Sequence, residues 1–202
     1  MKDVFEALVL FTNYAILAVF AQNAVFTRGL GVSRLVQLVG DSQVSSKLFV
    51  LMLCITQVLV APLAQLAGSL LAPLPGRAAL RPLVFLGCVA VVCLVLRGLL
   101  EVLPVPYNRQ MIRILPLAAL NSCVLGTVLV SRTQSFTLVQ SLGFGLGSGL
   151  GYLLAVLLVT EAQRRLRSRA IPEAFRGLPI TLVYIGVLAL AIYGFTGHSV
   201  IL

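Results

Sequence analysis

The sequence predicts an all-α integral membrane protein with six transmembrane helices, arranged as two inverted three-helix repeats. Of its 202 residues, 59% are hydrophobic and 10% are charged, with a mean hydropathy of +1.06. A soluble domain carries about 25% charged residues, so this chain could not cover a water-facing surface. Its apolar residues fall into six runs separated by short connections, and a polar pattern near residue 23 recurs near residue 121.

The first three apolar runs extend over residues 7–27, 48–74 and 82–103. Each is long enough to cross a bilayer, which takes about 20 helical residues. The first run contains polar residues and breaks at the glycine-containing segment 28–31. Arg97 and Glu101 lie four residues apart near the end of the third run, a spacing that favours an ion pair at the membrane interface. A place in an ion path is the alternative for this pair, because charge inside a membrane is costly and often functional.

The other three runs extend over residues 114–130, 136–160 and 178–202. The fourth is short, and Pro116 and a cluster of polar residues interrupt it. The fifth carries glycines 143, 147 and 151 at four-residue spacing, which lets helices approach closely. We therefore expect one transmembrane domain, residues 1–202, with repeats at about 1–103 and 104–202. Three crossings per half would make the second repeat enter from the opposite side.

The basic residues predict the orientation in the membrane. Eleven of the 15 lysines and arginines lie in the connections after the first, third and fifth runs, and four lie on the other side. The positive-inside rule makes the richer side cytoplasmic and places both termini outside. The net charge of +9 is spread thinly except at residues 164–169. Contact with anionic lipid of the bilayer explains that cluster better than nucleic acid, because it has no neighbouring aromatic residues for base stacking.

The repeated polar pattern points to the interior of the protein. Asn23 is followed ten residues later by Ser-Arg at 33–34, and Asn121 is followed at the same distance by Ser-Arg at 131–132. Interrupted helices at matching positions of two halves are typical of membrane proteins with a functional interior. We expect Asn23 and Asn121 to face inward and to satisfy backbone groups freed where each first-of-half helix breaks. The alternatives are chance similarity, or amides that bond within their own helices.

The four cysteines all lie in apolar runs, and none forms a C-x-x-C pair. Cys54, Cys88 and Cys93 are most simply explained as small buried hydrophobic residues. Cys123 differs because it lies in the polar break beside Asn121. It is the only residue to which the sequence attaches redox chemistry.

Two segments, Leu117-Ala-Ala-Leu-Asn-Ser-Cys-Val-Leu-Gly126 and Pro172-Glu-Ala-Phe-Arg-Gly177, resemble the small six-helix subunits shared by the Rnf and Nqr electron-transport complexes. Residues 186–197, within the last run, are similar to the last helix of that family. The expected outward termini match the A-type Rnf and E-type Nqr subunit. The resemblance is dense from about residue 113 to residue 197 and thinner before that.

The resemblance implies a subunit of the bacterial cytoplasmic (inner) membrane. Such complexes couple electron transfer between ferredoxin and NAD, or NADH and quinone, to Na⁺ or H⁺ export. Two homologous subunits of opposite topology pair in them, and each offers two cysteines to one [2Fe–2S] cluster. In this chain Cys123 stands near the second-half ligand position, although the family has Asn-Cys where this chain has Asn-Ser-Cys. Without gaps, Ser33 falls on the first-half ligand position; an alignment with a deletion removes that position.

Three functions follow as hypotheses. The first is a membrane subunit, catalytically silent or an electron relay, of a redox-driven ion-translocating oxidoreductase. The second is a divergent relative without the cluster that acts as a transporter, since inverted repeats with broken helices are a carrier architecture. The third is a structural partner subunit that holds another chain in place.

Overall fold

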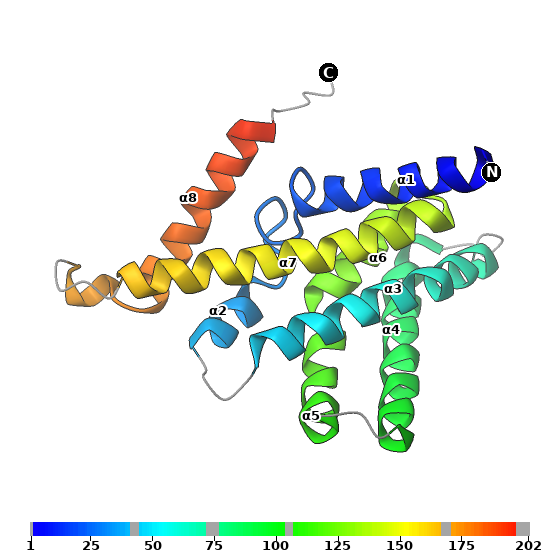
Figure 1. Ribbon diagram of the computed structural model, residues 1–202, viewed down its shortest axis with the longest axis horizontal. Coiled ribbons are helices and arrows are strands. Elements are labelled where there is room, and N and C mark those ends of the chain that lie inside the picture. Colours follow the sequence, from blue (N-terminus) through cyan, green and yellow to red (C-terminus); the bar gives the residue numbers. More distant parts are fainter. Residues whose placement is uncertain (1, 41–44, 72–76, 104–106, 167–170, 197–202) are drawn as a thin grey trace.

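The computed structural model describes residues 2–40, 45–71, 77–103, 107–166 and 171–196, and these form helices and turns with no strand among them (Figure 1). The all-α prediction is therefore confirmed. In chain order the helices are α1 (Lys2–Val19), α2 (Val32–Gly40), α3 (Ser46–Leu71), α4 (Arg77–Val102), α5 (Asn108–Ala119), α6 (Ser122–Thr133), α7 (Leu138–Leu166), the 3-10 helix η1 (Glu173–Phe175) and α8 (Leu178–Thr196). Residues 167–170 of the basic cluster lie outside the described part.

Several helices are long and apolar enough to cross a membrane. Within the described residues these are α3, α4, α7 and α8, and the bent pair α5 and α6 adds a fifth crossing if it is counted as one span. The two helices of that pair meet at 51° across the break after Ala119. Helix α1 is not among these helices, because its 18 residues include three charged side chains, Lys2, Asp3 and Glu6. The chain is thus a multi-pass membrane protein with at least four long apolar helices.

The first helix is shorter than the sequence predicts. The apolar pattern suggests a helix to Thr27, but α1 ends at Val19 and the chain then runs through turns to Gly31 before α2 begins. The reason lies in side chains that compete for backbone groups. The Asn23 side chain accepts hydrogen bonds from the backbone N–H groups of Val25 and Phe26, which a continuing helix would need for its own ladder. Gly31, at φ 74°, then adopts a left-handed conformation that favours glycine.

Helix α7 is the central element, with α1 along one side and α3 along another (Figure 1). Glycines make these approaches possible. A Cβ on Gly143 or Gly147 would collide with the backbone carbonyl oxygens of Phe11 and Ala15 on α1, and one on Gly149 would collide with Cys54 on α3. The close packing predicted from the glycine spacing is therefore confirmed. The main buried core is formed by residues of α2, α3, α4, α5, α6 and α7, whereas α8 projects away from the bundle and is largely exposed.

We predict that Gly147→Ala loosens the docking of α1 on α7. The added methyl group would meet backbone atoms of α1, which cannot rotate away as a side chain can. Overpacking of this kind typically costs about 1–3 kcal/mol of stability. Thermal unfolding in detergent, followed by helical circular dichroism, measures the effect. Gly87→Ala on α4 is the matched control, because nothing lies within 4 Å of its Cβ position and alanine favours helix. Equal unfolding temperatures for the two variants would contradict the packing argument.

Candidate functional site at the two helix breaks

Asn23 stabilises the break between α1 and α2. The residue is fully buried, and its Nδ2 donates to the carbonyl oxygen of Val19 at 2.8 Å and to that of Gly151 on α7 at 3.2 Å. Its Oδ1 accepts from the N–H groups of Val25 at 2.9 Å and Phe26 at 3.2 Å. Unsatisfied backbone groups are very costly in apolar surroundings. One amide therefore serves backbone groups on both sides of the break and ties the break to α7.

Asn121 occupies the corresponding place between α5 and α6. It is the N-cap of α6, and its Oδ1 accepts from the N–H of Cys123 at 2.9 Å. Asparagine is among the best residues for this position, because its side chain replaces a missing helical acceptor. Only 6% of its surface is exposed, and its Nδ2 has no hydrogen-bond partner among the described residues. The two asparagines thus cap backbone at the two breaks in different ways.

The two breaks meet each other, and the first of them is bonded to one short segment of α7. The hydroxyl of Tyr152 donates to the carbonyl oxygen of Gly31 at 3.2 Å, while the neighbouring Gly151 accepts from Asn23. The N–H of Gly31 in turn donates to the Ser122 hydroxyl at 2.9 Å, on the first turn of α6. Segments 91 residues apart in the sequence are thereby joined directly, and Gly151 and Tyr152 of α7 hold the first of them.

Cys123 points away from the meeting point of the breaks. Its side chain is fully buried, and its Sγ lies 3.5 Å from Nε2 of Gln57 on α3 and 3.6 Å from Oγ of Ser148 on α7. The same Gln57 nitrogen donates to the hydroxyl oxygens of Thr127 and Ser148, both at 3.2 Å. Cys123 is therefore part of a polar cluster that joins α3, α6 and α7 inside the protein.

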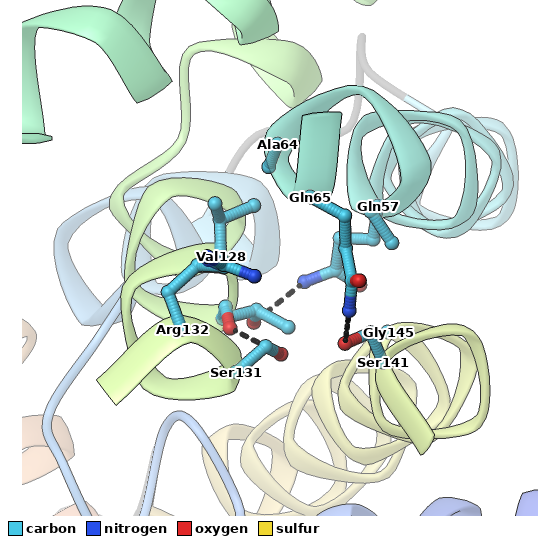
Figure 2. Close-up of a pocket in the computed structure, with 10 residues that line it drawn as sticks. Gln57, Ala64, Gln65, Val128, Ser131, Arg132, Ser141 and Gly145 are labelled. Carbon is cyan, nitrogen blue, oxygen red and sulfur yellow. Dashed lines mark hydrogen bonds between the residues drawn. The ribbon is translucent and has the colours of Figure 1, made fainter. Parts of the chain in front are cut away.

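A second polar layer lies beside this cluster. Figure 2 shows Gln57 and Gln65 reaching from α3 toward α6 and α7, with Ser131 and Arg132 opposite them. Gln65 donates to Oγ of Ser141 at 3.1 Å and to the Phe136 carbonyl at 2.8 Å. The free space between the layers is ≈ 10 Å³, room for about one water-sized group. These side chains form a closed, uncharged seam with Arg132 beside it.

A larger pocket opens where α2 and α6 begin. Its volume is ≈ 450 Å³, and the residues that line it include Ser33, Arg34, Gln37, Asn121 and Ser122. The side chains of Ser33 and Ser122 are exposed, whereas the neighbouring Cys123 is enclosed on the far side of its helix. The structure thus brings Ser33, Asn121 and Ser122 to one pocket and leaves Cys123 out of it.

The donor set at this pocket does not fit a shared iron–sulfur cluster. Such a cluster needs thiolates that reach out of each contributing chain. The side chains exposed at the start of α2 and at the start of α6 are hydroxyls, and Ser122, not Cys123, directly follows Asn121. The thiol of Cys123 is enclosed by its own chain's Gln57 and Ser148. The sequence could not separate Ser122 from Cys123, because adjacent residues differ only in the direction in which the helix turns them.

Several residues of the site were not singled out from the sequence. They are Gln57, Ser148 and Tyr152, and all three lie in apolar runs, where a hydrogen-bonding side chain needs a partner. A polar residue inside an apolar run was the available signal. Which of these residues meet, and on which helix, depends on tertiary packing.

Long apolar helices, an interrupted pair and an interior seam of amides and hydroxyls define a polytopic membrane protein built around broken helices. Residues 11–199 match the family model described as "Rnf-Nqr subunit, membrane protein". The chain therefore belongs to the Rnf-Nqr family, as the sequence motifs had indicated.

Individual relatives match a part of the chain. It is 36% identical over 118 residues to the A-type subunit of the ion-translocating oxidoreductase complex of Pasteurella multocida, which covers 58% of the chain and 62% of the relative. It is 31% identical over 120 residues to the E-type subunit of the Na⁺-translocating NADH-quinone reductase of Shewanella denitrificans, 59% of each. A third relative is the A-type subunit of the Na⁺-translocating ferredoxin:NAD⁺ oxidoreductase complex of Acetobacterium woodii, 36% identical over 83 residues, 41% of the chain and 43% of the relative. The chain thus spans roughly half the length of these relatives.

The orientation of the two neighbouring residues leads to a labelling prediction. In a background with Cys54, Cys88 and Cys93 replaced by Ala, native Cys123 should react with a small maleimide only after denaturation, because its side chain is fully buried. With Cys123 replaced by Ser and Ser122 by Cys, the new thiol should react at least tenfold faster in the folded chain, because position 122 is exposed. Mass spectrometry of timed samples gives both rates. Faster labelling of Cys123 would mean that the thiol, not the hydroxyl, faces the pocket.

Proposed function

We propose that this chain is a membrane subunit of an Rnf/Nqr-like complex in the bacterial inner membrane. The assembled complex would couple redox chemistry of ferredoxin and NAD(H), or of NAD(H) and quinone, to Na⁺ or H⁺ translocation. The observation that carries this is the family match over residues 11–199, together with relatives named as subunits of such complexes. In the complex the chain would have a structural or ion-path role, because the residues at its helix breaks are hydroxyls where an electron relay would need thiolates.

The proposal includes an architecture. The chain would form one transmembrane domain of six crossings, with repeats at about 1–103 and 104–202. In the first repeat α1 and α2 would share one crossing, and in the second α5 and α6 would share another. The shared arrangement of an asparagine at each break supports this, because Asn23 and Asn121 both bond to backbone N–H groups just after an interrupted helix. A homologous subunit of opposite topology would be the partner, and the open pocket at the start of α2 and α6 gives it a surface to face.

A transporter function is the second candidate. The observation in its favour is the buried polar cluster of Gln57, Thr127 and Ser148, with a small enclosed space beside it. Uncharged oxygen and nitrogen groups inside a membrane protein can line a path for a small solute or ion. In that case the chain would work without a redox partner.

Purification from the native membrane tests the proposal. A tagged chain solubilised in mild detergent should co-purify with other membrane and redox subunits, and vesicles containing it should show ion uptake driven by NADH or reduced ferredoxin. Deleting the chain should abolish that uptake. If the chain purifies alone, and proteoliposomes of the pure chain show solute flux without any redox donor, the transporter function is correct instead.

The orientation makes a separate prediction. With the native cysteines replaced, a cysteine at Glu173, in the exposed η1 connection, should react with a membrane-impermeant maleimide only from the cytoplasmic side. A cysteine at the exposed Gln134, beside Arg132, should react only from outside. Labelling of intact cells and of inverted vesicles distinguishes the two sides. The reverse pattern would place the termini inside and would match the other subunit type of the family.

A further inference from the structure

We infer that the two helix breaks are closed on each other by hydrogen bonds and that this chain supplies no ligand to an iron–sulfur cluster. The family resemblance implies a thiolate at each break, reaching out of the chain toward a partner. The pocket at the start of α2 and α6 offers hydroxyls there instead, and no cysteine is among the described residues that line it. Iron–sulfur clusters select soft thiolate ligands, so this donor set does not suit one.

The backbone N–H groups where the breaks meet already have acceptors within the chain. Gly31 donates to the Ser122 hydroxyl at 2.9 Å. Cys123 donates to Oδ1 of Asn121 at 2.9 Å, and Val124 donates to the Asn121 carbonyl oxygen at 3.0 Å. Bound clusters depend on hydrogen bonds to their sulfur atoms, which help to set the reduction potential. These three donors are used inside the chain and are therefore not free to bond a cluster.

The two breaks are also in direct contact with each other. A Cβ on Gly31 would lie 3.0 Å from Oδ1 of Asn121 and 3.4 Å from Cβ of Cys123. It would lie only 2.7 Å from Cε2 of Tyr152, so even a methyl group at this point would force the ring to move. Gly31 is therefore packed against Asn121 and Cys123 of the second break, with no space for an added group.

The one cysteine near the breaks is held in the interior. The Sγ of Cys123 lies 3.5 Å from Nε2 of Gln57 and 3.6 Å from Oγ of Ser148, and none of the residue's surface is exposed. A ligand of a cluster shared between two chains must reach the surface that faces the partner. Turning this thiol outward would break its contacts with Gln57 and Ser148. Cys123 thus belongs to the interior polar cluster, and the hydroxyl of Ser122 occupies the surface.

The inference gives Ser122 a mechanical role. Its hydroxyl joins two segments that lie 91 residues apart, and Tyr152 holds the same Gly31 from α7 at 3.2 Å. This junction is a property of the single chain. The consequence for the complex is that its electron path bypasses this chain, a point that rests on the proposed function and narrows the role of the chain to structure or ion movement.

Hydrogen–deuterium exchange of the full chain in nanodiscs tests the junction. Ser122→Ala should speed exchange at the Gly31 N–H about tenfold, because this N–H loses its acceptor. Ser122→Thr, which keeps a hydroxyl, should exchange at nearly the wild-type rate. Ser33→Ala is the matched control, since Ser33 is an exposed serine at the start of α2 that takes no part in this bond. Mass spectrometry of peptides that cover residues 28–34 gives the rates, and circular dichroism checks folding. Equal rates for Ser122→Ala and Ser33→Ala would overturn the junction.

Iron measurements test the ligand assignment in the complex that co-purifies with the chain. The iron content per complex and the electron paramagnetic resonance spectrum should be the same for wild type, Cys123→Ala, Ser33→Ala and Ser122→Ala. Loss of iron or of an iron–sulfur signal in any of these variants would overturn the inference. If the chain purifies alone, the proposed function fails, whereas the exchange rates still decide the junction. Iron that the pure chain carries and that Cys123→Ala removes would also show the inference to be wrong.

Discussion

The structure depends on keeping backbone hydrogen bonds satisfied where helices stop inside an apolar protein. Asn23 does this most completely, since its single amide accepts from Val25 and Phe26 and donates to Val19 and Gly151. Each of these groups would be costly if left unpaired without water. Gly151 must be glycine at this point, because a Cβ there would lie 2.8 Å from Nδ2 of Asn23. The position of the break in the chain and the sequence of α7 at the contact therefore depend on each other.

Helix α7 connects the first break to the rest of the helix bundle. Its glycines bring the backbones of α1 and α3 close, and its Gly151 and Tyr152 hold the break between α1 and α2. Ser148, one turn earlier, joins the Gln57 and Thr127 cluster. Interhelical hydrogen bonds in membrane proteins are individually modest, about 0.6 kcal/mol on average, so the combined effect matters more than any single bond. The same helix thus provides close packing, polar pairing and support for the pocket.

The family resemblance implies cysteine ligands for an iron–sulfur cluster at the helix breaks, and the side chains at the breaks of this chain differ from that expectation. An intramembrane iron–sulfur relay needs thiolates at exposed positions of the broken helices. Here the exposed positions hold Ser33 and Ser122, and Cys123 is enclosed in the polar cluster that joins α3, α6 and α7. The helix N-termini and Arg34 remain as an electropositive surface without a thiolate. Membership of the family does not require the relay, because fold and packing do not depend on the ligand residues.

Composition and periodicity determined the all-α membrane class, most helix positions and the glycine packing of α7, because those features depend on local apolar surface and residue size. The repeated asparagines were visible as polar residues in apolar runs. The early end of α1 was missed. The competing bonds of Asn23 with Val25 and Phe26 are local, but the Gly151 acceptor that also binds this amide lies 128 residues away. Tertiary structure alone decided that Ser122 faces the pocket and Cys123 the interior. Adjacent residues on a helix point about 100° apart, so a side chain's surroundings depend on which neighbours pack against each face.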